Sequence, residues 1–133
     1  MSDIVQNPAL EVYEHWETYI QTIVGNNYSM EWSTKVEELP WALLFLMGTP
    51  TRQADLEGHE IATNISFQTE SYANGRNALT DAYRIDDVSH QAMIDLGFTR
   101  TYGPELIRNN NNPLTRRVVS RYSRIYTGFF NAD

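Results

Sequence analysis

One short apolar run constrains the fold of this chain more than any other feature. Residues 41–47 read Trp-Ala-Leu-Leu-Phe-Leu-Met, follow Pro40 and stop before Gly48 and Pro50. The run is far shorter than the roughly 20 residues of a membrane span, and it has no polar face for an amphipathic helix. It suits a strand that is covered on both faces. We therefore expect a layered domain with a sheet inside it.

A second segment, 60–72, alternates between apolar and polar residues in the manner of a strand. One side of this strand would place Ile65 and Phe67 in the core. The other side would turn Gln68 and Glu70 toward water or toward a partner. The segment is therefore predicted to have one dry and one wet face.

Two helices and three further strands complete the expected elements. Asn7 and Pro8 are typical of a helix start, and apolar residues recur every three or four positions up to Gly25, which predicts a helix over 8–24. A second helix is expected over 76–96, with Gly97 as its C-cap. Further strands are expected at 28–32, 99–107 and 114–126.

The second helix is predicted to bury one apolar stripe, made of Ala78, Leu79, Ala82, Ile85, Val88, Ala92 and Leu96. The polar segment 49–58 is expected to form a flap or hairpin extension. The fold prediction is a single α+β domain over residues 1–133. In it a mainly antiparallel sheet of four to five strands packs against two helices.

Composition excludes several classes of function. The chain has no cysteine, which rules out thiol catalysis, cysteine-ligated zinc and iron–sulfur clusters. Hydrophobic residues make up 41% of the 133 residues, enough to fill one core. The first residues lack the basic and apolar regions of a secretory signal peptide, so synthesis in the cytoplasm is expected, without membrane association.

The net charge of −7 is unevenly distributed along the chain. Residues 1–60 hold ten Asp and Glu against Lys35 and Arg52, whereas residues 61–133 hold seven acids and eight arginines. This division predicts a molecule with one acidic side and one more basic side. An acidic surface repels nucleic-acid phosphates, and opposite charges on two surfaces favour head-to-tail self-association. Ordinary solvated surface charge is an equally compatible interpretation.

Histidines with acidic neighbours offer the only candidate catalytic chemistry. On the second helix His90 follows Asp86 and Asp87 at spacings that bring each carboxylate beside the imidazole. A small hydrolase is one hypothesis, but no nucleophile motif or metal-binding motif accompanies these residues. A surface ion pair is the favoured interpretation, as it is for His15 with Glu11 on the first helix. No catalytic residue, metal site or cofactor is therefore expected.

Four arginines, Arg116, Arg117, Arg121 and Arg124, lie in the expected last strand together with tyrosines. Arginines and aromatic residues are typical of single-stranded nucleic-acid platforms, so a small nucleic-acid-binding module is an alternative function. Strand alternation, however, divides the arginines between the two faces of the sheet. Divided arginines favour bidentate pairing with acids, within the chain or on a neighbouring subunit.

Three segments occur in an order that resembles a known protein family. Residues 65–72 read Ile-Ser-Phe-Gln-Thr-Glu-Ser-Tyr, the second helix ends Met93-Ile-Asp-Leu-Gly-Phe98, and residues 121–126 read Arg-Tyr-Ser-Arg-Ile-Tyr. This order resembles the tail terminator, or tail-to-head joining, proteins of long-tailed bacteriophages. The resemblance covers residues 38–126, whereas the first helix and the asparagine run at 109–112 depart from the family pattern.

The resemblance implies a non-enzymatic α+β subunit that assembles into a hexameric ring at the head-proximal end of the phage tail. Such rings cap the tail tube protein, stop its polymerisation and dock to the head connector or stopper protein, and DNA passes through the lumen without specific binding. Another connector or tail-completion protein is an alternative. The candidate subunit contacts are the four arginines of the last strand. The candidate axial contacts are Thr49, Thr51, Arg52, Gln53, Asp55, Glu57, Asn109, Asn110, Asn111 and Asn112.

Overall fold

The computed structural model describes residues 8–30, 39–47, 63–107 and 114–126. In chain order these form α1 (Pro8–Val24), β1 (Tyr28–Ser29), β2 (Trp41–Leu46), β3 (Thr63–Asn74), α2 (Ala78–Asp95), β4 (Thr99–Ile107) and β5 (Thr115–Tyr126). Neither described helix is long and apolar enough to cross a membrane. The predicted flap at 49–58 lies outside the described residues.

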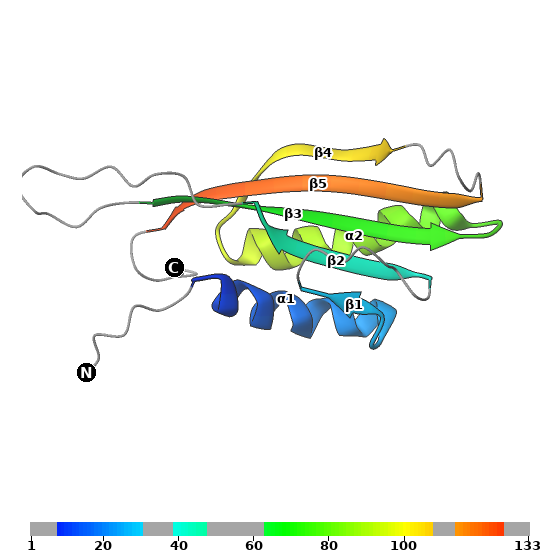
Figure 1. Ribbon diagram of the computed structural model, residues 1–133, viewed down its shortest axis with the longest axis horizontal. Helices are drawn as coiled ribbons and strands as arrows, with labels where there is room; N and C mark the ends of the chain where they lie inside the picture. Colours follow the sequence, from blue (N-terminus) through cyan, green and yellow to red (C-terminus); the bar gives the residue numbers. More distant parts are fainter. Residues whose placement is uncertain (1–7, 31–38, 48–62, 108–113, 127–133) are drawn as a thin grey trace, which may run out of the picture.

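The five strands form one sheet in the order β1-β2-β3-β5-β4 (Figure 1). All neighbouring pairs are antiparallel except β1 with β2, which is parallel. The two longest strands, β3 and β5, pair over their full length, from Thr63 opposite Tyr126 to Asn74 opposite Thr115. This arrangement confirms the predicted α+β class, with a mainly antiparallel sheet and two helices.

Both helices cover the same face of the sheet, and the main core lies between them and the strands (Figure 1). The largest fully buried side chains of this core come from every layer: Trp16 and Ile20 from α1, Ile85 and Met93 from α2, Leu44 from β2, Phe67 from β3 and Tyr122 from β5. Each helix contributes its apolar stripe because only that side faces the sheet. The opposite face of the sheet carries no described helix.

The apolar run that suggested a buried strand is confirmed as β2, which lies between β1 and β3. Ala42 and Leu44 point to the helices and are fully buried, and Leu43 points to the other face and is also buried. The continuous run of apolar residues is explained by this burial on both sides, because neither face of β2 is left to water.

The apolar stripe predicted for α2 is only partly correct. Leu79 is 45% exposed, whereas Asp86, Ser89 and Met93 are buried. The buried side of α2 includes Asp86 and Ser89 because both find hydrogen-bond partners inside the fold, Asp86 with Ser120 of β5 and Ser89 with Trp16 of α1. Apolar periodicity alone does not reveal such partners.

Two glycines are required by the backbone. Gly97 has a φ of 86° and ends α2 as predicted, while the amide of Phe98 donates to the carbonyl of Met93 at 3.0 Å. Gly103 has a φ of 89°, and a Cβ at this position would lie 2.3 Å from the carbonyl oxygen of Val119. β4 therefore approaches β5 more closely at Gly103 than any side chain allows.

Candidate functional site

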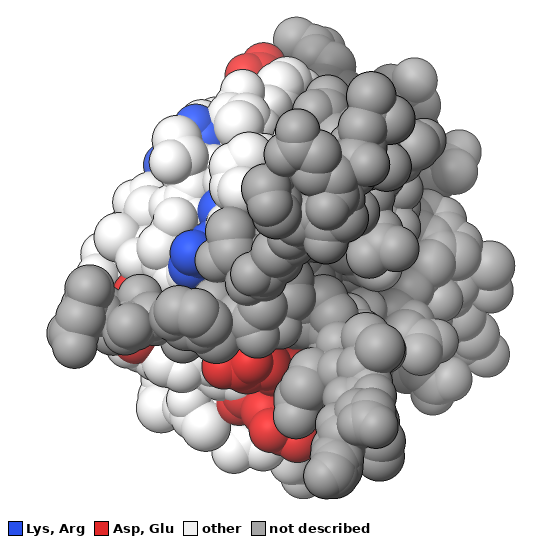
Figure 2. Space-filling model, turned by 90° about the vertical axis from the view of Figure 1, so that its left-hand side faces the viewer, with Lys and Arg blue, Asp and Glu red and all other residues white. Residues whose placement is uncertain are grey.

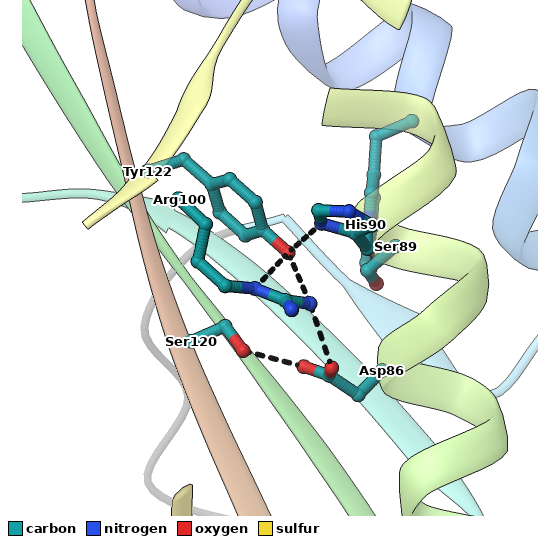
Figure 3. A network of polar contacts seen from close by, with 7 residues as sticks. Asp86, Ser89, His90, Arg100, Ser120 and Tyr122 are labelled. Carbon is teal, nitrogen blue, oxygen red and sulfur yellow. Dashed lines mark hydrogen bonds and ion pairs between the residues drawn. The ribbon is translucent and has the colours of Figure 1, made fainter. Parts of the chain in front are cut away.

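A buried polar network joins α2 to strands β4 and β5 on the helix-covered face (Figure 3). Arg100 Nη2 donates to Asp86 Oδ2 at 3.1 Å and to the Tyr122 hydroxyl at 3.0 Å. Ser120 Oγ donates to Asp86 Oδ1 at 2.7 Å. The Tyr122 hydroxyl also lies 3.2 Å from His90 Nδ1. The network therefore links one helix and two strands through charged and hydroxyl groups.

Arg100 and burial set the charges in this network. Arg100 Nε and Nη2 both donate to the Tyr122 oxygen, and the direction of the contact between that hydroxyl and His90 Nδ1 depends on which ring nitrogen of His90 carries a proton. Burial and the charge of Arg100 lower the pKa of His90, which favours its neutral form. Burial raises the pKa of Asp86 even though Ser120 and Arg100 oppose the shift, and burial raises the pKa of Tyr122 to about 12.

The geometry of the network fits a structural tie better than a catalytic site. Ser120 is fully buried and donates to Asp86, so its hydroxyl is not presented to His90 as a nucleophile would be. The expected surface ion pair between Asp86 and His90 is also wrong, because Asp86 is only 2% exposed and pairs with Arg100. These residues hold α2 against the sheet.

Polar contacts tie α1 to α2. Trp16 Nε1 donates to Ser89 Oγ at 2.9 Å inside the core. His15 Nε2 lies 2.7 Å from Asp95 Oδ2, so His15 pairs with the second helix and not with Glu11 on its own helix. The sequence places Glu11 one turn from His15, but the packing of the helices places Asp95 in contact with it.

A second network lies on the opposite face of the sheet and centres on Glu70, which is fully buried. Arg117 binds it in a bidentate manner, with Nε to Oε1 at 2.9 Å and Nη2 to Oε2 at 3.0 Å. Gln68 Nε2 donates to Glu70 Oε2 at 2.6 Å, and the Tyr72 hydroxyl donates to Glu70 Oε1. Three strand residues therefore satisfy one carboxylate.

Opposing effects set the ionisation of Glu70. Burial alone would raise its pKa, but hydrogen bonds from Arg117, Tyr72 and Gln68 together with the Arg117 charge outweigh burial and lower the pKa. Glu70 is therefore ionised at neutral pH. Burial and the neighbouring Glu70 raise the pKa of Tyr72, which keeps its hydroxyl protonated as a donor.

The four arginines proposed as subunit contacts divide between the two faces, as strand alternation predicts. Arg117 is engaged with Glu70, and Arg121 donates to Gln68 Oε1 at 2.8 Å while its guanidinium lies 4.8 Å from the centre of the Tyr102 ring. On the helix side, Arg124 donates to the carbonyl of Leu96, and Arg116 is half-buried. Of the four, only Arg121 is exposed, and the other three are half-buried.

The candidate axial contacts at 49–57 and 109–112 all lie outside the described residues. Within the described ranges, no group of three or more His, Asp or Glu side chains is placed to hold a metal ion. The two described histidines are His15, which contacts Asp95, and His90, which belongs to the network around Tyr122.

Charged side chains are visible in Figure 2 at the end of the molecule where α1 begins. Acidic side chains gather low in this view, at the level that α1 occupies in Figure 1, arginines lie above them, and a further acidic side chain lies above the arginines. The α1 helix carries Glu11, Glu14 and Glu17 and no Lys or Arg. Most acids of residues 1–60 lie outside the described residues, so the division into one acidic and one more basic side stays a prediction.

The sequence did not indicate the central positions of Asp86 and Glu70. Alternation predicts a wet side of β3 at Glu70, yet the long side chains of Arg117, Gln68 and Tyr72 surround this carboxylate. The sequence does contain one indication. An acid in the middle of a strand, beside an apolar run, needs a cation whose side chain points to the same face of the sheet from a neighbouring strand. Which arginine that is depends on the register.

The fold is similar to that of a protein chain in a solved particle. A chain from a structure titled "Virion of native gene transfer agent (GTA) particle" matches 94% of this chain over 100% of its own length, with a TM-score of 0.62 and 13% sequence identity. No family model matches the sequence, and no curated protein matches it. The similarity concerns the fold alone.

Proposed function

We propose that this chain is a structural subunit of a phage-like virion and that it works as a tail terminator. In this role it caps the tail tube as a ring, stops tail polymerisation and provides the surface to which the head connector docks. The observation that carries the proposal is the match in fold to the full length of a virion chain. No catalytic step belongs to this role.

The segments that resemble tail terminators support the proposal because they build the core of this fold. The rings of Phe67 and Phe98 lie 5.6 Å apart in an edge-to-face arrangement. Met93 and Tyr122 are buried in the same cluster. Gly97, four residues after Met93, ends α2. The shared motif is therefore a packing motif, which links the resemblance to the fold and not to a chemical site.

The two rival functions receive less support from the geometry. A hydrolase that uses Asp86 and His90 would need an accessible nucleophile, and Ser120 is buried. A nucleic-acid platform would need free arginines on one face, but Arg117 is bound to Glu70 and Arg121 is bound to Gln68. The net charge of −7 also opposes binding to phosphates.

The partners of a terminator follow from its position in the particle. We propose a homo-oligomeric ring, most simply a hexamer, that contacts the tail tube protein on one side and the connector or stopper protein on the other. The loop residues at 49–57 and 109–112 are the candidates for these axial contacts. DNA would pass through the lumen without specific binding, and an acidic inner wall would allow its passage.

Tube capping tests the function directly. Purified chain is added to polymerising tail tube protein of its own particle, and tube length is measured by negative-stain electron microscopy. We expect shortened tubes with a ring at one end. Tubes of unchanged length without a ring at either end would contradict the terminator role, and rings bound only to isolated connectors would favour the alternative of another connector or tail-completion protein.

A further inference from the structure

Four large apolar side chains are exposed at the end of the molecule where α2 begins and β4 ends. We call them the α2–β4 patch: Leu79, Tyr83, Leu106 and Leu114, which are 45%, 37%, 36% and 65% exposed. Because Leu79 and Tyr83 lie one turn apart, they share one side of α2, and Asp86 on the same side pairs with Arg100 of β4. The two apolar residues of α2 therefore face β4.

The same end of the molecule has a small second core. This cluster contains only Ala73, Ala78, Ala82 and Val118. Val118 is paired with Leu106 across β4 and β5, and the amide of Gly75 donates to the carbonyl of Leu114, so both patch leucines border the cluster. In an ordinary core the large apolar side chains are buried. At this end of the molecule small side chains are buried and large apolar side chains are exposed. An apolar surface of this kind marks an interaction site.

The charges around the patch indicate the chemistry of its partner. Arg76 is exposed just before α2, and Arg116 pairs with Ala73 of the small core on the helix side of the sheet. Two acids lie on α2 itself, Asp81 in its first turn and Asp87 one turn beyond Tyr83, so the positive charge beside the patch comes from Arg76 and Arg116. The surface therefore fits a partner that presents apolar and acidic side chains together.

The chain itself carries such a surface at its other end. On α1, Leu10 is 58% exposed, and Glu11 and Glu14 beside it are exposed. α1 begins at the end of the molecule where α2 finishes, opposite the α2–β4 patch (Figure 1). Two complementary surfaces at opposite ends make a head-to-tail contact, which closes into a ring when the rotation between subunits permits.

We infer that the α2–β4 patch of one copy binds the Leu10, Glu11 and Glu14 surface of α1 in a second copy. This inference rests on the ring proposed above and names its contact surface. Leu10 packs on Leu79 and Leu106. Glu11 and Glu14 meet Arg76.

A mixing experiment tests the head-to-tail geometry. Leu79→Asp blocks one end and Leu10→Asp blocks the other, and both side chains are exposed enough for the variants to fold. By sedimentation velocity we expect wild type to form rings, each variant alone to be monomeric, and an equimolar mixture to form dimers only, through the one intact pair of surfaces. Ile94→Asp is the matched control on α2 because Ile94 is 44% exposed and outside both surfaces.

The other outcomes separate this inference from the proposed function. Rings that persist in both blocked variants would overturn the contact surface and leave the ring proposal intact. Dimers of Leu10→Asp alone would indicate a symmetric contact through the patch and would also overturn the inference. Wild-type protein that stays monomeric at every concentration would contradict self-association through these surfaces, while tube capping would still test the terminator role.

A charge swap provides a second readout. Glu14→Arg and Arg76→Glu should each shift assembly to at least tenfold higher protein concentration, and the double variant should recover much of the loss because each contact then contains both exchanged charges. Failure of the double variant to assemble better than either single variant would contradict the pairing of these two ends.

Discussion

At the scale of single residues, two positions show how closely this sheet is fitted. Gly103 allows β4 to lie against the backbone of β5, and Glu70 is a charge placed in the middle of the sheet. Each residue contacts a specific neighbour on β5. Gly103 lies against the carbonyl of Val119, and Glu70 pairs with Arg117. Substitutions at these positions therefore test contacts that lie far apart in the sequence.

Replacing Gly103 by alanine should lower the free energy of unfolding by about 3 kcal/mol, since the new Cβ would combine a left-handed backbone with a clash against the Val119 carbonyl. Gly75→Ala is the matched control because Gly75 has a φ of 94° but no atom within 4 Å of a new Cβ. Its cost should be only about 1 kcal/mol. Urea denaturation of the two variants measures the difference, and equal losses would mean that the close approach is not important.

Replacing Glu70 by glutamine should cost about 3 kcal/mol of unfolding free energy, because Arg117 would keep its charge without its partner. The double change Glu70→Met and Arg117→Met should recover a large part of this loss. Glu105→Gln, at an exposed position on β4, serves as the control and should stay within about 0.5 kcal/mol of wild type. A double variant less stable than Glu70→Gln would contradict the paired arrangement.

At the scale of elements, the polar network determines how α2 sits on the sheet. Asp86 and His90 lie one turn apart on α2 and reach Arg100 on β4 and the residues Ser120 and Tyr122 on β5. A purely apolar interface could slide or rotate, whereas these directed hydrogen bonds fix the rotation of the helix. The position of α2 in turn determines which of its apolar residues remain exposed.

The network should make stability depend on pH through His90. Its pKa is lower in the folded chain than the ordinary value near 6.5, so the unfolded chain binds more protons and stability falls as pH decreases from about 7 through the folded pKa. In His90→Asn, whose amide can still form a hydrogen bond with Tyr122, this slope should be smaller, with a difference of at most about 1.4 kcal/mol per pH unit. Thermal unfolding from pH 7.5 to 5 measures both proteins.

Asp86 acts in the opposite direction in the same experiment. Its pKa is raised by burial, so its ionisation costs stability as pH rises above the ordinary range of a carboxyl group, and acidification relieves that cost. Both proteins retain Asp86, so the comparison of wild type with His90→Asn reports the titration of His90 together with its effect on the pKa of Asp86. Parallel stability curves for the two proteins would show that His90 does not titrate with folding.

At the scale of the whole molecule, the described chain has two different ends. The end at the start of α2 carries apolar residues and Arg76, and the end at the start of α1 carries Leu10 and acids. Such polarity suits a subunit that repeats head to tail around an axis. The same distribution of charge makes general binding to nucleic acid unfavourable.

Fluorescence anisotropy with a labelled single-stranded oligonucleotide tests this last point. At physiological salt we expect no saturable binding, since the net charge is −7 and the arginines of β5 are divided between faces. The Arg121→Gln variant should behave as wild type does. Saturable binding that falls steeply with added salt and is lost in Arg121→Gln would favour the nucleic-acid-binding alternative.

The sequence by itself determined the elements and their class. Local patterns indicated these elements: the apolar run of β2, the alternation of β3 and the glycine that ends α2. Such patterns arise from backbone preferences and from the side-chain period of each element. Strand parity also divided the arginines correctly between the faces of β5. Each of these predictions depends on neighbours within a few residues along the chain.

Only the tertiary structure decided which charges are buried and what surrounds them. Glu70 meets Arg117 because the register of β3 with β5 brings them close across 47 positions of sequence, and Asp86 meets Ser120 because α2 packs on the same strand. Desolvation and pairing depend on distance in space, which a one-dimensional pattern does not contain. The exposed patch beside the small alanine core is visible for the same reason only after folding.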